Sequence, residues 1–404
     1  MRAAESLMSE VCFEELVAPL EPAVFFRDYW QKQIFLGSSA ASVGSLVSLA
    51  DLEFLLTSLT TPGPDWIQVV KAGSTRATSS FCTVESFVSL PKIYGAFAAG
   101  YTIQLAKMHK RSAPVGRLCR SADIAFTAAG MPLAHRVGSH LYLTPAHSVG
   151  FSPHYDSHDV FVVQVQGTKR WKIYGALEEF PVEMQQGDVP RDRLPPLSHD
   201  ILLEAGQVLY VPRGIFHEAL AEDRHSIHVT LDVFPYTWAD LVARLMRAEG
   251  RFRAALPVGT WTEDGISPAL AAGLRERLDE LLAAGDLAGV ASGMLEDFVG
   301  GLDTLPADGL GQLLDLEAVV TLDTVLARRP GSFAQIIAKN GNLELRFPSS
   351  GFGGPAALVP VFRFLRDSPR FAVRDLPSLL SGESKLAIAK ELIREGFLEI
   401  AGSP

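Results

Sequence analysis

Cysteine is scarce in this 404-residue sequence, and its distribution excludes several kinds of site. Cys12, Cys82 and Cys119 lie far apart, and no Cys-x-x-Cys pair occurs that would suggest a zinc ribbon or a dithiol redox centre. An odd number of scattered cysteines is also unlike the disulfide framework of a small secreted domain. We therefore expect three reduced thiols.

Long hydrophobic runs and a positive net charge are missing as well. Apolar runs such as 355–362 are much shorter than the roughly 20 residues that span a bilayer. The first 16 residues carry acidic side chains and lack the apolar stretch of a secretory signal. The formal charge of -10 argues against a general nucleic-acid binder and favours a basic partner. We expect a soluble, cytoplasmic protein of two or three domains.

Two changes of pattern divide the sequence. Residues 1–236 contain a helical segment near the start and then short β-like runs broken by Gly and Pro, which predict an antiparallel barrel or sandwich. Residues 237–308 have apolar positions every three or four residues, as amphipathic helices do. Residues 309–404 combine helical stretches with a pattern that predicts a hairpin at 341–359, and together these suggest a winged helix. The predicted strands are 141–144, 160–165, 170–174, 207–211 and 226–233.

The last two regions invite hypotheses about partners. Basic and acidic residues nearly balance after residue 311 and form no basic stripe, so direct DNA binding is not expected. The helices from about 238 to 302 have apolar faces that need to be covered, and a two-fold dimer is the commonest way to cover them. Docking of these helices within one chain is the alternative.

The most informative stretch is GFSPHYDSHDVFVVQVQGTKRWKIYG, residues 150–175. His154 and Asp156 are two residues apart, so on an extended segment both side chains point to one side and could share a metal. A helical zinc site made of His154 and His158 is less favourable, because Tyr155 stands where such sites need Glu. Pro153 and the β-branched run that follows also disfavour a helix.

A second motif supplies another histidine. Residues 206–217 read GQVLYVPRGIFH, and the spacing of Gly206, Pro212, Gly214 and His217 resembles the second motif of the cupin superfamily. The glycines and the proline permit the tight turn that would deliver His217 into the mouth of a barrel. The alternative is that His217 only packs in the core.

Two histidines and one carboxylate form a facial triad, which binds iron on one side and leaves the other positions open. His154, Asp156 and His217 are the predicted ligands. Cupins with four ligands have a glutamate at the position of Val160 and a histidine at the position of Asp156. Both differences point to the oxygenase branch of the superfamily.

Lys169 is predicted to lie on the apolar face of its strand, together with Trp171 and Ile173. A lysine is rarely buried unless an anion meets it there. The distal carboxylate of 2-oxoglutarate is a suitable anion, because its keto-acid end can bind iron while its tail reaches an ammonium group. The alternative is a lysine that extends out of one end of the barrel.

The segments PHYDSHDVFVVQVQGTKRW, YLTPAHSVGF, YVPRGIFHEAL, HSIHVTLDVFP and FFRDYWQKQIFL resemble the JmjC-type ribosomal oxygenases. These enzymes hydroxylate arginine or histidine in ribosomal proteins. The resemblance covers most of the chain. It implies an α+β protein with a double-stranded β-helix, followed by a helical dimerisation region and a winged helix, and it implies iron(II) and 2-oxoglutarate as cofactors.

The resemblance also implies roles for further residues. Tyr142 and Thr230 stand where similar enzymes bind the cosubstrate, and Lys169 stands where bacterial members often have arginine. His140 and Asp232 are departures, because eukaryotic relatives tend to have Asn and Ser at these positions. The roles of these two residues stay open.

Five other polar residues are weaker candidates. Asp159 and His158 could lie at the rim of the site or support it, but a solvated turn explains them equally well. Arg213 could meet an acidic group of the substrate, or be simply exposed. His225 and His228 flank Ser226, and His228 is expected to share the inward face with Thr230.

These observations lead to one hypothesis and several alternatives. The chain is expected to be an iron(II)- and 2-oxoglutarate-dependent dioxygenase that hydroxylates a protein side chain, with a ribosomal protein as the leading substrate. The alternatives are hydroxylation of a natural-product peptide or small molecule, demethylation of N-methyl-lysine, and a non-catalytic cupin scaffold. A further alternative is a nucleic-acid regulator whose barrel senses 2-oxoglutarate or iron.

Overall fold

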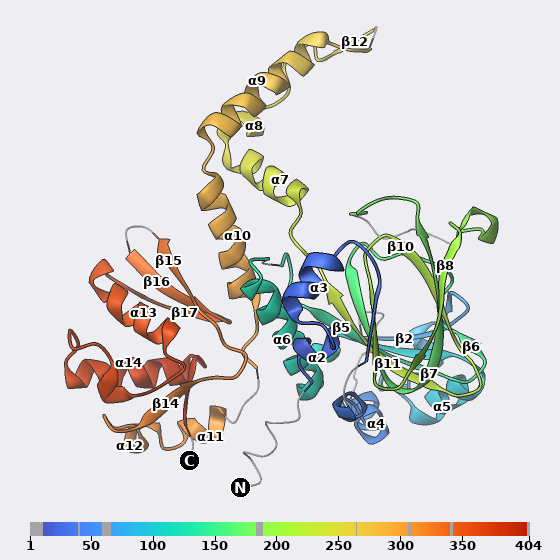
Figure 1. Cartoon of the computed structure of the whole chain (residues 1–404), viewed down its shortest axis with the longest axis horizontal. Helices are drawn as coiled ribbons and strands as arrows, with labels where there is room; N and C mark the ends of the chain where they lie inside the picture. Colours follow the sequence, from blue (N-terminus) through green and yellow to red (C-terminus); the bar gives the residue numbers. More distant parts are fainter. Residues whose placement is uncertain are drawn as a thin grey trace. The chain divides into compact units, whose positions relative to one another are not determined.

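The computed structural model describes residues 11–38, 41–58, 66–131, 133–182, 189–263, 265–305, 309–339 and 342–401. The chain forms two compact units (Figure 1). The first comprises Met1–Gly130, His135–Phe234 and Leu305–Asp308, and the second comprises Met131–Ala134, Pro235–Thr304 and Gly309–Pro404. Within the described residues no helix is long and apolar enough to cross a membrane. All three cysteines are free, as predicted.

The first unit is built on a large antiparallel sheet of eleven strands, in agreement with the predicted barrel. The main path of the sheet runs β1-β9-β7-β11-β5-β4-β2-β3. Outside this path, β8 and β10 pair with β7, and β6 pairs with β10. The strands are β1 (Phe35–Ser38), β2 (Ile67–Lys71), β3 (Ser74–Thr75), β4 (Thr102–Ala106), β5 (Gly138–Thr144), β6 (Ser148–Val149), β7 (Asp159–Ala176), β8 (Leu197–Glu204), β9 (Gln207–Val211), β10 (Ile215–Ala221) and β11 (Ser226–Val233).

Strand β7 joins the two halves of this sheet. Its first half pairs with β9 and β11, and its second half pairs with β8 and β10. The change occurs near Gly167, whose φ of 70° favours glycine. A Cβ at this position would lie 1.8 Å from the carbonyl oxygen of His225. The prediction of two strands, 160–165 and 170–174, was therefore wrong, because the glycine bends one continuous strand instead of ending it.

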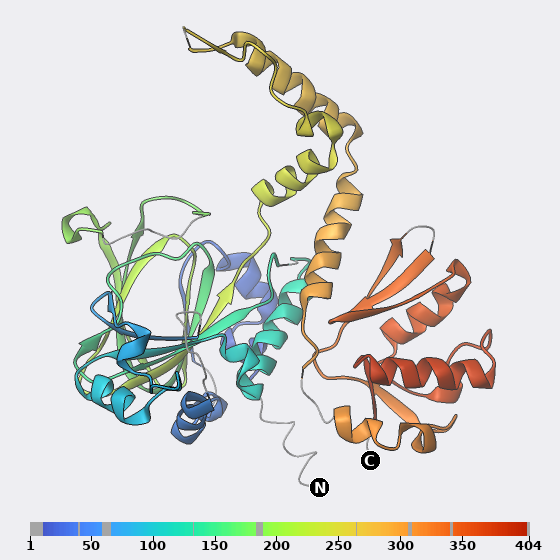
Figure 2. The ribbon, with the colours of Figure 1, turned by 180° about the vertical axis from the view of Figure 1, so that it is seen from behind.

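The described residues of the first unit also form five α-helices, of which α5 contacts β4 and α6 contacts β5. They are α2 (Phe13–Leu16), α3 (Pro22–Asp28), α4 (Leu49–Ser58), α5 (Leu90–Ala98) and α6 (Ala113–Ala128). Both views show α2, α3 and α6 side by side (Figures 1 and 2). Phe13 packs edge-on against Phe126 of α6 and Phe161 of β7, with ring centroids 5.6 and 5.7 Å apart. Because side chains alternate along a strand, Phe161 faces this aromatic layer and its neighbours Val160 and Val162 face the interior of the barrel.

The second unit begins with helices and ends in two small sheets. Its helices are α7 (Trp238–Ala248), α8 (Gly250–Arg253), α9 (Pro268–Ala284), α10 (Leu287–Gly301), α11 (Gly309–Leu313), α12 (Leu316–Val319), α13 (Val359–Asp367) and α14 (Gly382–Arg394). Its strands are β12 (Trp261–Thr262), β13 (Gly265–Ile266), β14 (Val325–Arg328), β15 (Gln335–Lys339), β16 (Asn342–Phe347), β17 (Ser350–Gly354), β18 (Arg370–Ala372) and β19 (Leu398–Ile400).

The hairpin predicted at 341–359 is present as β16 and β17, which pair in antiparallel register. Strand β15 extends it to three strands, and β18-β14-β19 form a second small sheet. These sheets pack with α13 and α14 around a core that includes Phe347, Phe362 and Phe397. The strands β14, β15, β18 and β19 were not predicted, because runs of three to five residues carry little periodic signal. The assignment of this part as a winged helix stays a prediction, as does the division at residues 236 and 308.

Candidate metal centre

A cavity of about 310 Å³ lies inside the barrel of the first unit. Most of its lining side chains are polar or titratable, and the rest are apolar. It contains all the residues predicted to bind metal or cosubstrate, and also His140, His158, His228 and Asp232. The lining residues are Gln68, Gln104, His140, Tyr142, Gly150, Phe151, His154, Asp156, His158, Val160, Val162, Lys169, Trp171, Val211, His217, Ala219, His228, Thr230 and Asp232.

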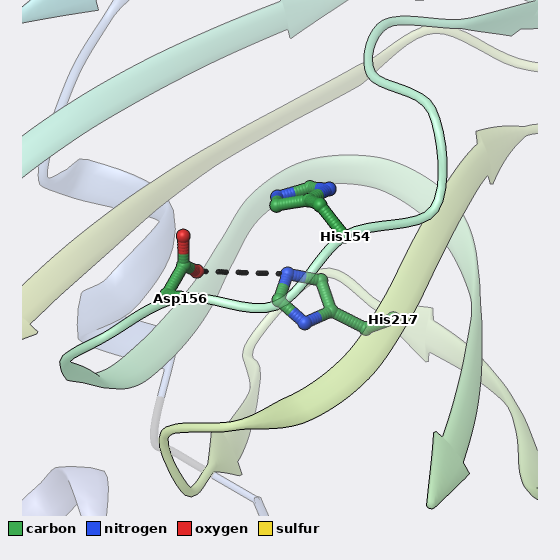
Figure 3. A group of neighbouring side chains, drawn as sticks. All are labelled: His154, Asp156 and His217. Atoms are coloured by element: carbon green, nitrogen blue, oxygen red, sulfur yellow. Dashed lines mark ion pairs between the residues drawn. The ribbon is translucent and has the colours of Figure 1, made fainter. Parts of the chain in front are cut away.

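Three side chains converge at this cavity with the geometry of a metal site. His154 and Asp156 come from the segment before β7, and His217 comes from β10 (Figure 3). One ligand atom of each residue lies within 4.8 Å of the other two. Nε2 of His217 is 3.7 Å from Oδ2 of Asp156. The structure thus brings together the three residues that the two separate motifs predicted.

Both histidines are oriented by the backbone. Nδ1 of His154 is 2.8 Å from the carbonyl oxygen of Ser152, and Nδ1 of His217 is 3.1 Å from that of Ile215. Hydrogen on each Nδ1 leaves the lone pair on Nε2 for a metal, which is the usual arrangement of metal-binding histidines. Burial, together with the neighbouring His154, lowers the pKa of His217 to about 4. His217 is therefore neutral at neutral pH, as a ligand must be.

The backbone around His154 differs from the prediction in one respect. His154 and Asp156 do not lie on a regular strand, since only His154 forms an isolated bridge, with His217. Two backbone hydrogen bonds join His154 and His217, and the amide of Gly214 donates to the carbonyl oxygen of Asp156. The segment is thus fixed against the turn before β10, and these contacts hold the three ligands together.

Lys169 is buried in the same cavity, as predicted from its position on the apolar face of its strand. Only 4% of its surface is exposed, and its ammonium group donates to Oγ1 of Thr144 at 3.1 Å. Within the described part of the chain it forms no ion pair, and burial lowers its pKa to about 7. A buried cation without a counter-charge is unfavourable. An anionic ligand at this end of the cavity would therefore stabilise the charged form of Lys169.

Tyr142 and His228 are opposite each other on β5 and β11, and both line the cavity. Their rings are stacked, with centroids 4.7 Å apart and an interplanar angle of 6°. Nδ1 of His228 is buried and has no hydrogen-bond partner among the described residues. Burial lowers the pKa of His228 well below its usual value, so it is neutral. The inward orientation of His228 was expected from its spacing with Thr230.

Asp232 is the centre of a hydrogen-bonded group. Nε2 of His140 is 3.1 Å from Oδ2 of Asp232, and the Thr230 hydroxyl donates to Oδ1 at 3.1 Å. Nε2 of His158 is 3.7 Å from Oδ1. Burial would raise the pKa of Asp232, but the hydrogen bonds from His140 and His158 outweigh it and lower this pKa. Asp232 is therefore ionised, and Thr230 already has a partner within the protein.

Three of the weaker candidates are not among the residues that line the cavity. Asp159 is fully buried beneath it and accepts hydrogen bonds from Tyr210, at 2.7 Å, and from Gln31, at 3.0 Å. It fastens the N-terminal segment to the sheet and is not a residue of the rim. Arg213 does not line the cavity, and its guanidinium lies over the ring of Phe180. His225 is also absent from the lining.

Sequence reasoning missed Gln104 as a residue of the cavity, whereas Trp171 was expected on the inward face with Lys169. Gln104 lies on β4, where all five residues are buried, so no alternation marked its inner face. The available signal was a single amide within an otherwise apolar run. Gln104 donates from Nε2 to Tyr142 and lies 3.2 Å from Nδ1 of His140. Trp171 packs beside His217 with ring centroids 5.8 Å apart, which shields the metal cluster from solvent.

The comparisons with known proteins agree with this geometry. Residues 122–241 match the family model of the JmjC domain. Ribosomal oxygenase 2 from Rattus norvegicus is 30% identical over 308 residues, which is 71% of this chain and 63% of that protein. The bifunctional lysine-specific demethylase and histidyl-hydroxylase NO66 from Drosophila persimilis is 32% identical over 237 residues, or 57% of this chain and 33% of that protein. The chain thus spans less than two thirds of these relatives.

Solved structures extend the likeness in fold to nearly the whole chain. The ribosomal oxygenase YcfD from Escherichia coli matches with a TM-score of 0.53 and 15% identity, covering 95% of this chain and 98% of that one. A structure of YcfD in complex with cobalt and 2-oxoglutarate gives the same TM-score and identity. Residues 122–241 are thus identified as a JmjC domain, and beyond that domain the chain is similar to the ribosomal oxygenases.

Proposed function

We propose that this chain is an iron(II)- and 2-oxoglutarate-dependent dioxygenase that hydroxylates a protein side chain, an arginine or a histidine of a ribosomal protein. One observation carries the proposal. A two-histidine, one-carboxylate cluster shares a single cavity with Lys169, a buried lysine that has no carboxylate partner among the described residues. A non-catalytic scaffold has no need of such a lysine, because an unpaired buried cation only destabilises the fold.

The residues present fit both cofactors. His154, Asp156 and His217 would hold iron(II) through two nitrogens and one oxygen, which leaves positions open for other ligands. Lys169 would pair with the distal carboxylate of 2-oxoglutarate, with Tyr142 as a further hydroxyl donor. Iron and 2-oxoglutarate together supply the oxidation of a C–H bond by dioxygen, with release of succinate and carbon dioxide.

The protein has three tasks in this scheme. The backbone carbonyls of Ser152 and Ile215 orient the two histidines, so the metal would meet a rigid set of ligands. The apolar side chains around the metal cluster, among them Trp171 and Val162, exclude water from the reacting atoms. Lys169 fixes the far end of the cosubstrate, so only one end is free to bind metal.

The protein substrate is supported by the relatives and by charge. A ribosomal protein is commonly basic, and the formal charge of -10 on this chain would attract it over long distances. The name of the Drosophila relative also includes lysine demethylation, so this is the second candidate function. Both reactions oxidise a C–H bond next to the metal, and they differ in the product.

Mass spectrometry tests the proposed reaction. Ribosomal proteins from cells that lack this chain are incubated aerobically with the purified protein, iron(II) and 2-oxoglutarate. Hydroxylation adds one oxygen atom to an arginine or a histidine, whereas demethylation removes a methylene equivalent from a methylated lysine. Incubation without 2-oxoglutarate is the control. If the proteins are unmodified while succinate accumulates, the substrate is of another class, such as a small molecule.

The affinity for 2-oxoglutarate is expected to fall as the pH rises above 7. Lys169 has a pKa of about 7 in the free protein, and only its charged form attracts a carboxylate. Below pH 7 the lysine is already protonated, whereas above it binding must take up a proton, so the dissociation constant rises up to about tenfold per pH unit. Isothermal titration in buffers of different ionisation enthalpy measures this proton uptake. A constant affinity from pH 6.5 to 9 would contradict it.

The helices of the second unit are the basis of a second proposal, a homodimer. Several large apolar side chains on α7, α9 and α10 are exposed, including Trp238 at 83% and Leu282 at 82%. Exposed apolar patches of this kind mark interaction surfaces in soluble proteins, and a two-fold dimer is the commonest solution. Sedimentation over a range of concentrations tests this proposal, and the mass of a single chain at micromolar concentration would refute it.

A further inference from the structure

A positively charged stretch lies within this acidic chain. Residues 54–122 contain eight Lys and Arg residues but two acidic ones, whereas the whole chain has a formal charge of -10. Such a local excess of charge indicates a surface for an anionic partner, and the net charge of the chain conceals it. We infer that the edge of the sheet around Trp66 binds a single strand of RNA, by stacking of a base and by contacts to phosphates. This inference goes beyond the proposed function and rests on it only for the choice of RNA.

The place of Trp66 follows from the register of the sheet. Trp66 directly precedes β2, and its carbonyl oxygen accepts a hydrogen bond from the amide of Ala106, at 3.0 Å. Ala106 lies opposite His140 on β5, so the three residues form one row across the sheet. Side chains two residues apart share a face, and Gln68, two residues after Trp66, lines the cavity. Trp66 therefore lies on the cavity side of the sheet, two strands or about 10 Å from His140.

Two cations surround the indole of Trp66. The guanidinium carbon of Arg111 lies 3.8 Å from the centroid of the ring, and Nζ of Lys107 lies 5.1 Å from it. Neither cation forms an ion pair with a described residue, and Nη1 of Arg111 is buried without a hydrogen-bond partner among those residues. Burial lowers the pKa of Arg111 to about 10, so the guanidinium is still charged at neutral pH. An anion bound here would supply the missing partner.

The exposed indole decides which kind of anion fits. Trp66 is 36% exposed, so its ring is accessible from solvent. The face of an aromatic ring is negative and repels a carboxylate, whereas a nucleobase stacks on such a ring or on a guanidinium plane. Stacking needs unpaired bases, and the phosphates that join them would contact Arg111 and Lys107. A ribosomal protein lies beside RNA in the ribosome, so RNA is the anion that would accompany the proposed substrate.

A second group of the same composition provides a control. The guanidinium carbon of Arg76 lies 5.1 Å from the ring centroid of Tyr101, and Nζ of Lys71 lies 5.6 Å from it. This group lies at the other end of the ladder between β2 and β4, about 17 Å of extended strand from Trp66. Arg76→Gln therefore removes the same charge as Arg111→Gln, from a similar ring, at a place distant from the inferred site.

Fluorescence anisotropy tests the inference on the whole protein, without iron or 2-oxoglutarate. The probe is a fluorescein-labelled oligouridine of about eight nucleotides, within the usual range of single-strand sites. We expect a dissociation constant of about 1–100 μM at moderate salt. Trp66→Ala is expected to weaken binding about 5- to 150-fold, as the loss of one stacked base does, without changing the dependence on salt.

The two cations are tested by their effect on that salt dependence. Arg111→Gln and Lys107→Gln are each expected to reduce the slope of log K against log salt concentration by about 0.7, because each removes one phosphate contact. Arg76→Gln should leave the slope unchanged. Lys107 is exposed, so its variant keeps the test valid if Trp66→Ala does not fold.

Three further probes identify the partner. An RNA duplex of the same length is expected to bind more weakly, because its bases already stack on each other. The corresponding oligodeoxyuridine should bind no more tightly than the RNA, and an oligoglutamate peptide of the same charge should not displace it. Equal binding of duplex and single strand, tighter binding of the DNA strand, or displacement by oligoglutamate would each overturn the inference.

The inference is also overturned if the oligouridine does not bind, or if the Trp66, Lys107 and Arg111 variants bind it as the unmodified protein does. None of these measurements needs a cofactor or turnover. A failure of RNA binding is therefore distinct from an absence of hydroxylation, which would contradict the proposed function instead.

Discussion

Replacing His154 by alanine is expected to abolish metal binding at this site and, with it, succinate formation. His154 supplies one of three ligands, and its ring is held by the carbonyl oxygen of Ser152, so no neighbouring group can replace it without moving the backbone. Loss of residues that only support a metal ligand lowers metal affinity or activity about 10- to 100-fold, and loss of a ligand should exceed this. Titration with iron(II) under anaerobic conditions and a succinate assay measure both effects.

His199→Ala is the matched control. His199 is exposed on β8 and is not part of the cavity lining, so both metal affinity and succinate formation should be unchanged. Full succinate formation by His154→Ala would mean that the metal is held elsewhere. Loss of folding in His154→Ala would be visible in the far-ultraviolet circular dichroism spectrum and is not expected, because His154 is only partly buried.

Replacing Lys169 by methionine is expected to weaken 2-oxoglutarate binding by about 30- to 150-fold. A hydrogen bond between charged groups contributes roughly 2–3 kcal/mol, and methionine keeps the volume of the side chain but not its charge. Titration of the metal-loaded protein with 2-oxoglutarate measures the loss. Lys172→Met is the control, because Lys172 lies on the same strand but points to the other face.

The same substitution should stabilise the protein in the absence of cosubstrate. Burial lowers the pKa of Lys169 from 10.5 to about 7, so folding releases its proton or buries its charge at a cost of roughly 4–5 kcal/mol below pH 7. This cost decreases as the pH rises from about 7 to 10.5, because the unfolded chain then also loses the proton. Chemical denaturation at pH 6.5 and 9.5 should show a larger advantage of Lys169→Met at the lower pH. A destabilised variant at pH 6.5 would contradict this expectation.

Much of the candidate site followed from the sequence because its residues lie in short motifs with strict local geometry. The glycines and proline around His217 specify a turn, and alternation along 226–233 places His228 and Thr230 on one face. In both places the local backbone alone determines which way the side chain points. The position of Lys169 followed from the same argument.

Other features depend on contacts between distant segments and could not be predicted locally. The strand predicted to end at Gly167 continues, because the bend is stabilised by pairing with β8 and β10, which lie later in the chain. Asp159 looked like a residue of the site because it follows the metal motif, yet Gln31 and Tyr210 bind it on the other side of the sheet. The inward face of β4 was hidden because both of its faces are buried.

The pairing of β7 with β10 has a consequence for the cosubstrate. His217 lies opposite Ile173, and Lys169 is four residues before Ile173 on β7, or about 13 Å of extended strand. Neither end can move towards the other without breaking the ladder between them. If Lys169 binds the distal carboxylate, as proposed, this ladder fixes the distance that the dicarboxylate has to span.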